Sequence, residues 1–161
     1  MTLAPGRPAP SFSLAALGGG AVAIPDPAGR PALVAFFKDD CPTCRFTFPF
    51  LQRLHEQLGD RALVAGVSQD PAPRAAAWSK DLGLSFPIAV DGTGYPVSAA
   101  YGLRAVPTIC LLDGSGGLMR VAEGFGREAL QGMADDLAAR AGAPRPALYR
   151  EGETIPPLKP G

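Results

Sequence analysis

Three continuous apolar runs constrain the fold of this chain more than any other feature of its sequence. They cover Ala32–Phe37, Ala62–Val67 and Val106–Leu112, and each has the length of a strand. Segments with helical spacing of apolar residues follow each run, at 42–58, 72–82 and 127–141. Runs without polar alternation are typical of strands that helices cover on both faces of a sheet. The sequence therefore predicts an α/β fold with a central mixed β-sheet flanked by helices.

Shorter segments complete the predicted order of elements. Residues 12–14 and 21–24 flank a run of three glycines and predict an N-terminal β-hairpin. We expect further strands at 86–90 and 118–122, with a helical turn at 97–101. Residues 143–161 contain five prolines and few large apolar side chains. We therefore predict one domain over 1–142 and a Pro-rich tail over 143–161, which either drapes over the domain or is disordered.

Composition excludes several classes of function. Fifteen basic residues balance fifteen acidic ones, so the chain has no excess of positive charge with which to neutralise nucleic-acid phosphates. No apolar run approaches the ~20 residues that a membrane-spanning helix needs. The first residues, MTLAPGRPAPSFSL, lack the basic start and apolar stretch of a signal peptide. We therefore expect no nucleic-acid partner, no membrane segment and a cytoplasmic location.

The sequence Cys41-Pro42-Thr43-Cys44 lies between the first apolar run and the first predicted helix. Cysteines three residues apart at the start of a helix share one turn and can form a disulfide. Free N–H groups and the helix dipole favour a thiolate at the first cysteine and lower its pKa. Asp40 acts in the opposite direction, while Lys38 and Arg45 act with the dipole. The sequence alone does not fix whether these opposing effects raise or lower the pKa of Cys41.

A zinc site is the alternative interpretation of this cysteine pair, and zinc needs four ligands. The remaining soft candidates are Cys110 and His55. His55 lies eleven residues beyond Cys44 on the same helix, ~16 Å along its axis, so it cannot complete the same site. Cys110 lies in the third apolar run, where a buried free cysteine usually fills the core. We therefore favour redox chemistry for the pair and a core position for Cys110.

Several motifs together resemble the thioredoxin superfamily. The segment FFKDDCPTCR at 36–45 is similar to its active-site segment, Pro49 to its helix proline, and Val106-Pro107-Thr108 to its cis-proline loop. Residues 5–14, 67–70 and 101–108 are similar to the redoxin, or AhpC/TSA-like, branch. The resemblance covers about residues 5–140 and implies a thioredoxin-like fold.

The resemblance implies a thiol–disulfide oxidoreductase of the TlpA-like type. Cys41 is then the nucleophile and Cys44 the resolving thiol. Pro107 follows a cis peptide bond, and the Val106 backbone pairs with the substrate chain. The implied substrate-binding residues are Pro42, Thr43, Val106 and Pro107. The implied partners are protein disulfides or dithiols and a thiol reductant, with no cofactor and no metal.

Two positions differ from the family pattern, because Ala35 and Thr47 stand where acidic residues usually accept a proton. A thiol peroxidase is the second hypothesis, motivated by the redoxin-like opening. However, Lys38 replaces the Thr or Ser that would activate a peroxide, and Val106 replaces the expected Arg. A thioredoxin-like binding module with a stabilising disulfide is the third hypothesis.

Overall fold

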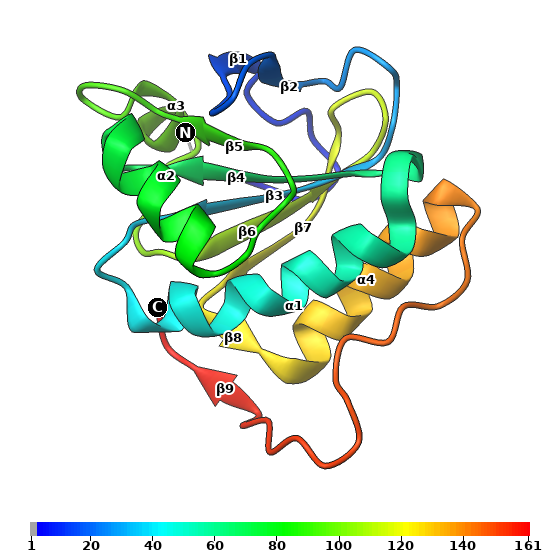
Figure 1. The fold of residues 1–161 in the computed structure, drawn as a ribbon. Coiled ribbons are helices and arrows are strands. Elements are labelled where there is room, and N and C mark those ends of the chain that lie inside the picture. The colour runs from blue at the N-terminus through cyan, green and yellow to red at the C-terminus, as the bar shows by residue number, and fades with distance from the viewer. Residues whose placement is uncertain (1–2) are drawn as a thin grey trace.

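A computed structural model describes residues 3–161, and a five-stranded mixed sheet forms its centre (Figure 1). The strand order is β5-β4-β3-β6-β7. The parallel part contains β3 (Ala32–Phe37), β4 (Leu63–Ser68) and β5 (Ile88–Val90). The antiparallel part adds β6 (Thr108–Leu112) beside β3 and β7 (Leu118–Glu123) beside β6. This sheet confirms the predicted architecture, and its three central strands, β4, β3 and β6, lie largely within the three apolar runs.

Neighbouring side chains of β3 show how the two faces of the sheet are covered. Phe37 packs against Phe48 of α1 (Pro42–Leu58) and stacks on Trp78 of α2 (Ala72–Asp81), with centroid distances of 4.7 and 4.4 Å. Phe36 points to the other face and contacts Tyr101, which follows α3 (Pro96–Ala100), at 5.1 Å. Since successive residues of a strand alternate between faces, α1 and α2 share one face and α3 lies on the other.

The close packing of α1 on the sheet depends on Gly66 in β4. A Cβ atom at this position would lie 2.7 Å from Ile88 and 3.1–3.2 Å from the rings of Phe37 and Phe48. Glycine therefore allows the rings to lie directly on the strand.

The N-terminal hairpin is also confirmed. It pairs β1 (Phe12–Ala15) with β2 (Ala21–Ile24) in antiparallel register and joins the sheet edge through a bridge between Ala16 and Ala89. The Ile24–Pro25 bond after it is cis, which the sequence did not indicate.

Three strands begin later than predicted, with β4 starting at Leu63 rather than at residue 62, and two short strands were not predicted. β5 begins at Ile88 rather than at residue 86, and β6 begins at Thr108 because residues 106 and 107 form the loop before it. A short pair, β8 (Phe125–Gly126) and β9 (Leu158–Lys159), was not predicted. It forms between distant parts of the chain, which no local pattern marks.

The Pro-rich segment 143–161 follows α4 (Arg127–Ala141) and packs on the domain. The 3-10 turn η1 (Gly59–Arg61) follows α1, and its Arg61 donates to the carbonyl of Gly142 at the end of α4. Leu148 is fully buried, and Tyr149 packs edge-on against Phe50 of α1 at 5.2 Å. Arg53 of α1 forms a paired contact with Glu153, with both N–O distances between 2.6 and 2.7 Å. Figure 1 shows the segment, in orange and red, passing along α4 and ending beside the start of α1. Of the two predicted behaviours, the structure has the draped one.

Candidate active site

The CPTC motif lies where β3 ends and α1 begins. Cys41 is the N-cap residue of α1, with extended backbone angles, and Pro42 occupies the first helical turn. The Cys44 N–H donates to Cys41 Sγ at 3.0 Å. Sulfur therefore satisfies one of the N–H groups left free at a helix start, the position that favours a thiolate.

The two cysteines form a disulfide, with a Cα–Cα distance of 5.2 Å. They differ in access, because Cys41 is 6% exposed whereas Cys44 is completely buried. An incoming sulfur can therefore reach Cys41 and cannot reach Cys44 without structural change. This asymmetry matches the roles that the resemblance implies for the pair.

The loop before β6 meets the motif from the neighbouring strand. The Val106–Pro107 bond is cis, and the Val106 carbonyl oxygen lies 3.4 Å from Cys41 Sγ. Antiparallel pairing of β6 with β3 sets Thr108 opposite Phe36, which brings the loop to the end of β3. The Thr108 hydroxyl donates to the Ala105 carbonyl at 2.7 Å and holds the loop closed. Residues 65 positions apart in the chain thus share one site.

The predicted site residues lie together in this region. Cys41, Thr43, Cys44, Val106 and Pro107 are all buried, whereas Pro42 is exposed at the start of the helix. The roles of these residues in binding a substrate stay predictions.

The charged groups near the motif have partners outside it. Asp39 accepts two hydrogen bonds from Arg74 of α2, at 2.7 and 2.9 Å. Asp40 extends into solvent and lies 3.8 Å from Lys38. The Arg45 guanidinium is 2.6 Å from an oxygen of Asp81. Each charge that the sequence placed near Cys41 is thus balanced by a neighbour of opposite sign.

The two positions that usually carry acids are fully buried and contain no carboxylate. Ala35 lies within β3, and the Thr47 hydroxyl donates to the Thr43 carbonyl one turn earlier in α1 at 2.7 Å. Because that hydroxyl is already engaged with the backbone, it does not replace the missing acid.

The other soft side chains lie in the core or elsewhere on α1. Cys110 is fully buried in β6 between Val34 of β3 and Val121 of β7, and burial raises the pKa of its thiol to about 12. Burial beside the Phe86 ring lowers the pKa of His55. Over residues 3–161, no three His, Cys, Asp or Glu side chains are grouped so that they could hold a metal ion.

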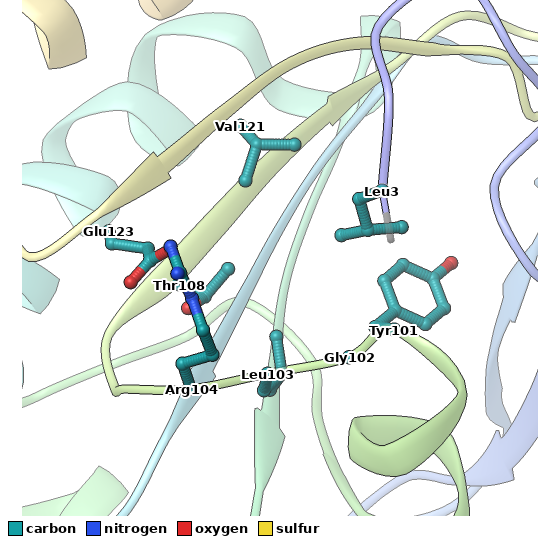
Figure 2. A pocket seen from close by; sticks show the side chains of 8 residues that line it. All are labelled: Leu3, Tyr101, Gly102, Leu103, Arg104, Thr108, Val121 and Glu123. Carbon is teal, nitrogen blue, oxygen red and sulfur yellow. The ribbon is translucent and has the colours of Figure 1, made fainter. Parts of the chain in front are cut away.

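A surface pocket of about 610 Å³ does not include either cysteine of the motif among its lining residues. Figure 2 shows its lining, with the Arg104 and Glu123 side chains close together on one wall; their ion pair measures 2.7 Å. A smaller pocket of about 230 Å³ is lined by Lys38, Gln69 and the residues from Leu103 to Val106. The smaller pocket adjoins the cis-proline loop, whose Val106 carbonyl oxygen lies 3.4 Å from Cys41 Sγ.

Sequence reasoning missed the last residues of the chain as part of the site. The Thr43 hydroxyl donates to the Pro160 carbonyl at 2.6 Å, and Gly161 lies against the backbone of Val106. The Pro-rich composition of the segment gave no signal for this position, since the contact joins residues 117 positions apart.

Comparison with known proteins agrees with this geometry. A sequence model described as the AhpC/TSA family matches residues 5–121. The chain belongs to the AhpC/TSA family. Its fold is that of a putative thiol:disulfide interchange protein DsbE from Chlorobium tepidum, with a TM-score of 0.77, 25% identity, and coverage of 87% of this chain and 99% of the other.

Curated relatives are similar over most of the chain. The thiol-disulfide oxidoreductase ResA of Halalkalibacterium halodurans is 28% identical over 121 residues, which are 74% of this chain and 68% of the relative. The thiol:disulfide interchange protein DsbE of Xylella fastidiosa is 32% identical over 114 residues, which are 69% of this chain and 57% of the relative. Together with the disulfide of the CPTC motif, these relatives identify the chain as a thiol–disulfide oxidoreductase and do not favour the peroxidase alternative.

Proposed function

We propose that this chain exchanges disulfides with protein substrates, with Cys41 as the attacking thiolate and Cys44 as the resolving thiol. The observation that carries the proposal is the position of Cys41 Sγ, which accepts the Cys44 N–H at 3.0 Å and lies 3.4 Å from the Val106 carbonyl. The sulfur is therefore both at a helix start and beside a backbone segment that can bind an extended peptide.

The reaction transfers two electrons in two exchange steps. In the dithiol form, the Cys41 thiolate attacks one sulfur of a substrate disulfide, forms a mixed disulfide and releases the other substrate sulfur as a thiolate, which takes up a proton. Cys44 then loses its proton and attacks Cys41 Sγ, which releases the second substrate thiolate and leaves the Cys41–Cys44 disulfide of the structure. A thiol reductant restores the dithiol form, and the same steps in reverse oxidise a substrate dithiol.

Neither position at which an acid usually accepts the proton of Cys44 holds a carboxylate in this chain. Ala35 and Thr47 occupy the two usual positions, so the proton passes to solvent or to the departing substrate thiolate. Resolution of the mixed disulfide should therefore be the slower of the two steps, which favours trapping of substrates.

Trapping with Cys44→Ser tests the proposal. The variant should accumulate mixed disulfides with protein substrates through Cys41, and Cys41→Ser, the matched control, should accumulate none. The wild-type chain should also reduce insulin disulfides with dithiothreitol as the electron source. The absence of both trapped partners and insulin reduction refutes the proposal. Equal partner binding by Cys41→Ala would instead support a binding module.

Two further points belong to the proposal. The reduction potential of the Cys41–Cys44 pair decides whether the chain acts as reductant or oxidant in its compartment. The cytoplasmic location is also a proposal, which cell fractionation tests. Over residues 3–161, no helix combines the length and the apolar character needed to cross a membrane.

A further inference from the structure

Residues 158–161 run from β8 to the CPTC motif and the cis-proline loop. Leu158 and Lys159 form β9 and pair in antiparallel register with Phe125 and Gly126 of β8. Next to this pair, the Arg127 N–H donates to the Pro157 carbonyl at 2.9 Å. The segment 158–161, which we call the tip, thus begins as an added strand.

The tip then continues to the CPTC motif. The Thr43 hydroxyl donates to the Pro160 carbonyl at 2.6 Å, so a motif side chain binds the backbone of the tip. The Lys159 ammonium lies over the ring of Phe46, one helical turn after Thr43, at 5.1 Å from the ring centroid. Two residues of the first turns of α1 therefore hold the tip.

Gly124 permits a close approach between the tip backbone and the loop that contains Pro107. Gly124 has a φ of +72°, and a Cβ atom there would lie 2.7 Å from the Lys159 carbonyl oxygen and 2.9 Å from the Gly161 nitrogen. Its N–H donates to the Pro107 carbonyl at 2.8 Å, so this glycine also contacts the cis-proline loop. The tip backbone therefore passes directly over the loop.

The tip ends at the backbone that is expected to pair with a substrate. A Cβ atom at Gly161 would lie 2.7 Å from the Val106 carbonyl oxygen, the same oxygen that lies 3.4 Å from Cys41 Sγ. Within residues 3–161, the N–H and C=O of Val106 form no hydrogen bond with another backbone group. The Val106 backbone thus has no β-ladder partner, and its carbonyl oxygen contacts only Cys41 Sγ and Gly161 among the contacts described above.

We propose that the tip is an intramolecular competitor that occupies the groove for substrate peptides, lined by Thr43, Val106, Gly124 and β8. The inference rests on the proposed function and adds to it the course of the substrate chain and its regulation. A substrate segment would bind in extended form, antiparallel to β8, after displacing the tip.

The strength of attachment changes along the segment in a way that suits this role. Leu148 is fully buried and Glu153 is held by two hydrogen bonds from Arg53, so the part before the tip is firmly anchored. In contrast, the Leu158 side chain is 75% exposed, and the tip has no buried apolar anchor of its own. The tip can therefore leave while its anchor stays, and tethering keeps its effective concentration high.

The test compares the full chain with a chain that ends at Pro157. A tip seated in the groove about 90% of the time lowers the apparent affinity for a substrate about tenfold. We therefore expect truncation to raise kcat/KM for insulin reduction about threefold to tenfold. The rate with the small hydroxyethyl disulfide, which needs no backbone pairing, should change less than twofold. Leu158→Ala is the matched control, because it keeps the backbone of β9 and removes an exposed side chain, and it should behave as the full chain.

A binding measurement completes the test. A synthetic peptide with the sequence of residues 153–161, ETIPPLKPG, should shift the amide resonances of Thr43, Val106 and Gly124 in the truncated chain and inhibit its insulin reduction competitively. Unchanged or lower kcat/KM after truncation, or an equal rise with the small disulfide, would overturn the inference while leaving the proposed function intact. If neither chain reduces insulin and Cys44→Ser traps no partner, the proposed function fails, and the peptide titration alone decides whether the groove binds the tip.

Discussion

Cys110 gives a prediction that tests the burial of a thiol in the centre of the sheet. Burial raises the pKa of this thiol from its ordinary 9.0 to about 12, so the folded chain keeps the proton when the unfolded chain has lost it. Between these pH values the unfolded state binds fewer protons, and the free energy of unfolding falls as the pH rises. At pH 10 the loss from this single thiol is about 1.4 kcal/mol, whereas at pH 8 it is close to zero.

The variant Cys110→Ala removes this pH dependence. At pH 8 it should be less stable by roughly 1–2 kcal/mol, because it removes a buried sulfur from a packed site. That deficit should shrink by about 1.4 kcal/mol at pH 10, since only the parent chain loses stability through Cys110.

The assay is urea unfolding followed by Trp78 fluorescence at pH 8, 9 and 10. Both chains carry Cys41→Ala and Cys44→Ala. These substitutions prevent disulfide exchange with the Cys110 thiolate that becomes exposed when the parent chain unfolds. Other alkaline groups, such as Tyr101, whose pKa is also raised by burial, are present in both chains and largely cancel in the difference. A stability difference that stays constant from pH 8 to pH 10 would refute the argument that Cys110 is a protonated core residue.

Three other perturbations test the attachment of the C-terminal segment and the loop before α3. Leu148→Ala should lower the free energy of unfolding in urea by about 2–5 kcal/mol, because the side chain is fully buried. Leu158→Ala, at an exposed side chain, should change this free energy by less than about 0.5 kcal/mol. Equal effects of the two variants would contradict the role of Leu148 as a buried anchor. The hydrogen bond from Arg53 lowers the pKa of Glu153 to about 2, so this contact stabilises the fold above pH 4.5 and is lost as the pH falls toward 2. An NMR titration should show the Glu153 midpoint returning toward 4.5 in Arg53→Gln, and an unchanged midpoint would exclude the contact in solution. The Asp91 carboxylate accepts hydrogen bonds from two backbone N–H groups at the start of α3, both at 2.8 Å. Asp91→Ala should therefore lower the free energy of thermal unfolding by about 2 kcal/mol or more. A loss below about 0.5 kcal/mol would contradict this capping role.

Local sequence was sufficient for the elements that form the framework of the site. The runs at 32–37 and 106–112 are apolar at nearly every position, and such runs become buried strands in any α/β arrangement. Cys41-Pro42 marks a helix start on its own, because proline suits the first helical turn and a side chain must cap the free N–H groups. The attacking and resolving thiols could therefore be predicted before the fold was known.

Contacts between distant residues could not be read in this way. The pairing of Asp39 with Arg74 leaves a charge near the motif balanced, yet the two residues are 35 positions apart and carry no pattern that links them. The location of the tip depends on every element between Thr43 and Pro160, because the sheet, α1 and α4 together decide where the segment can run.

The sequence by itself predicted a redox-active cysteine pair and the framework of the fold, since a cysteine pair at a strand-to-helix junction and the periodicity of the apolar residues are local properties. Only the tertiary structure decided what surrounds the sulfur: the Val106 carbonyl, the balanced charges and the chain's own tip at the groove. The physical reason is that the cysteine pair and the apolar periodicity depend on neighbours along the chain. The surroundings of the sulfur depend on packing, which brings together residues that no sequence spacing relates.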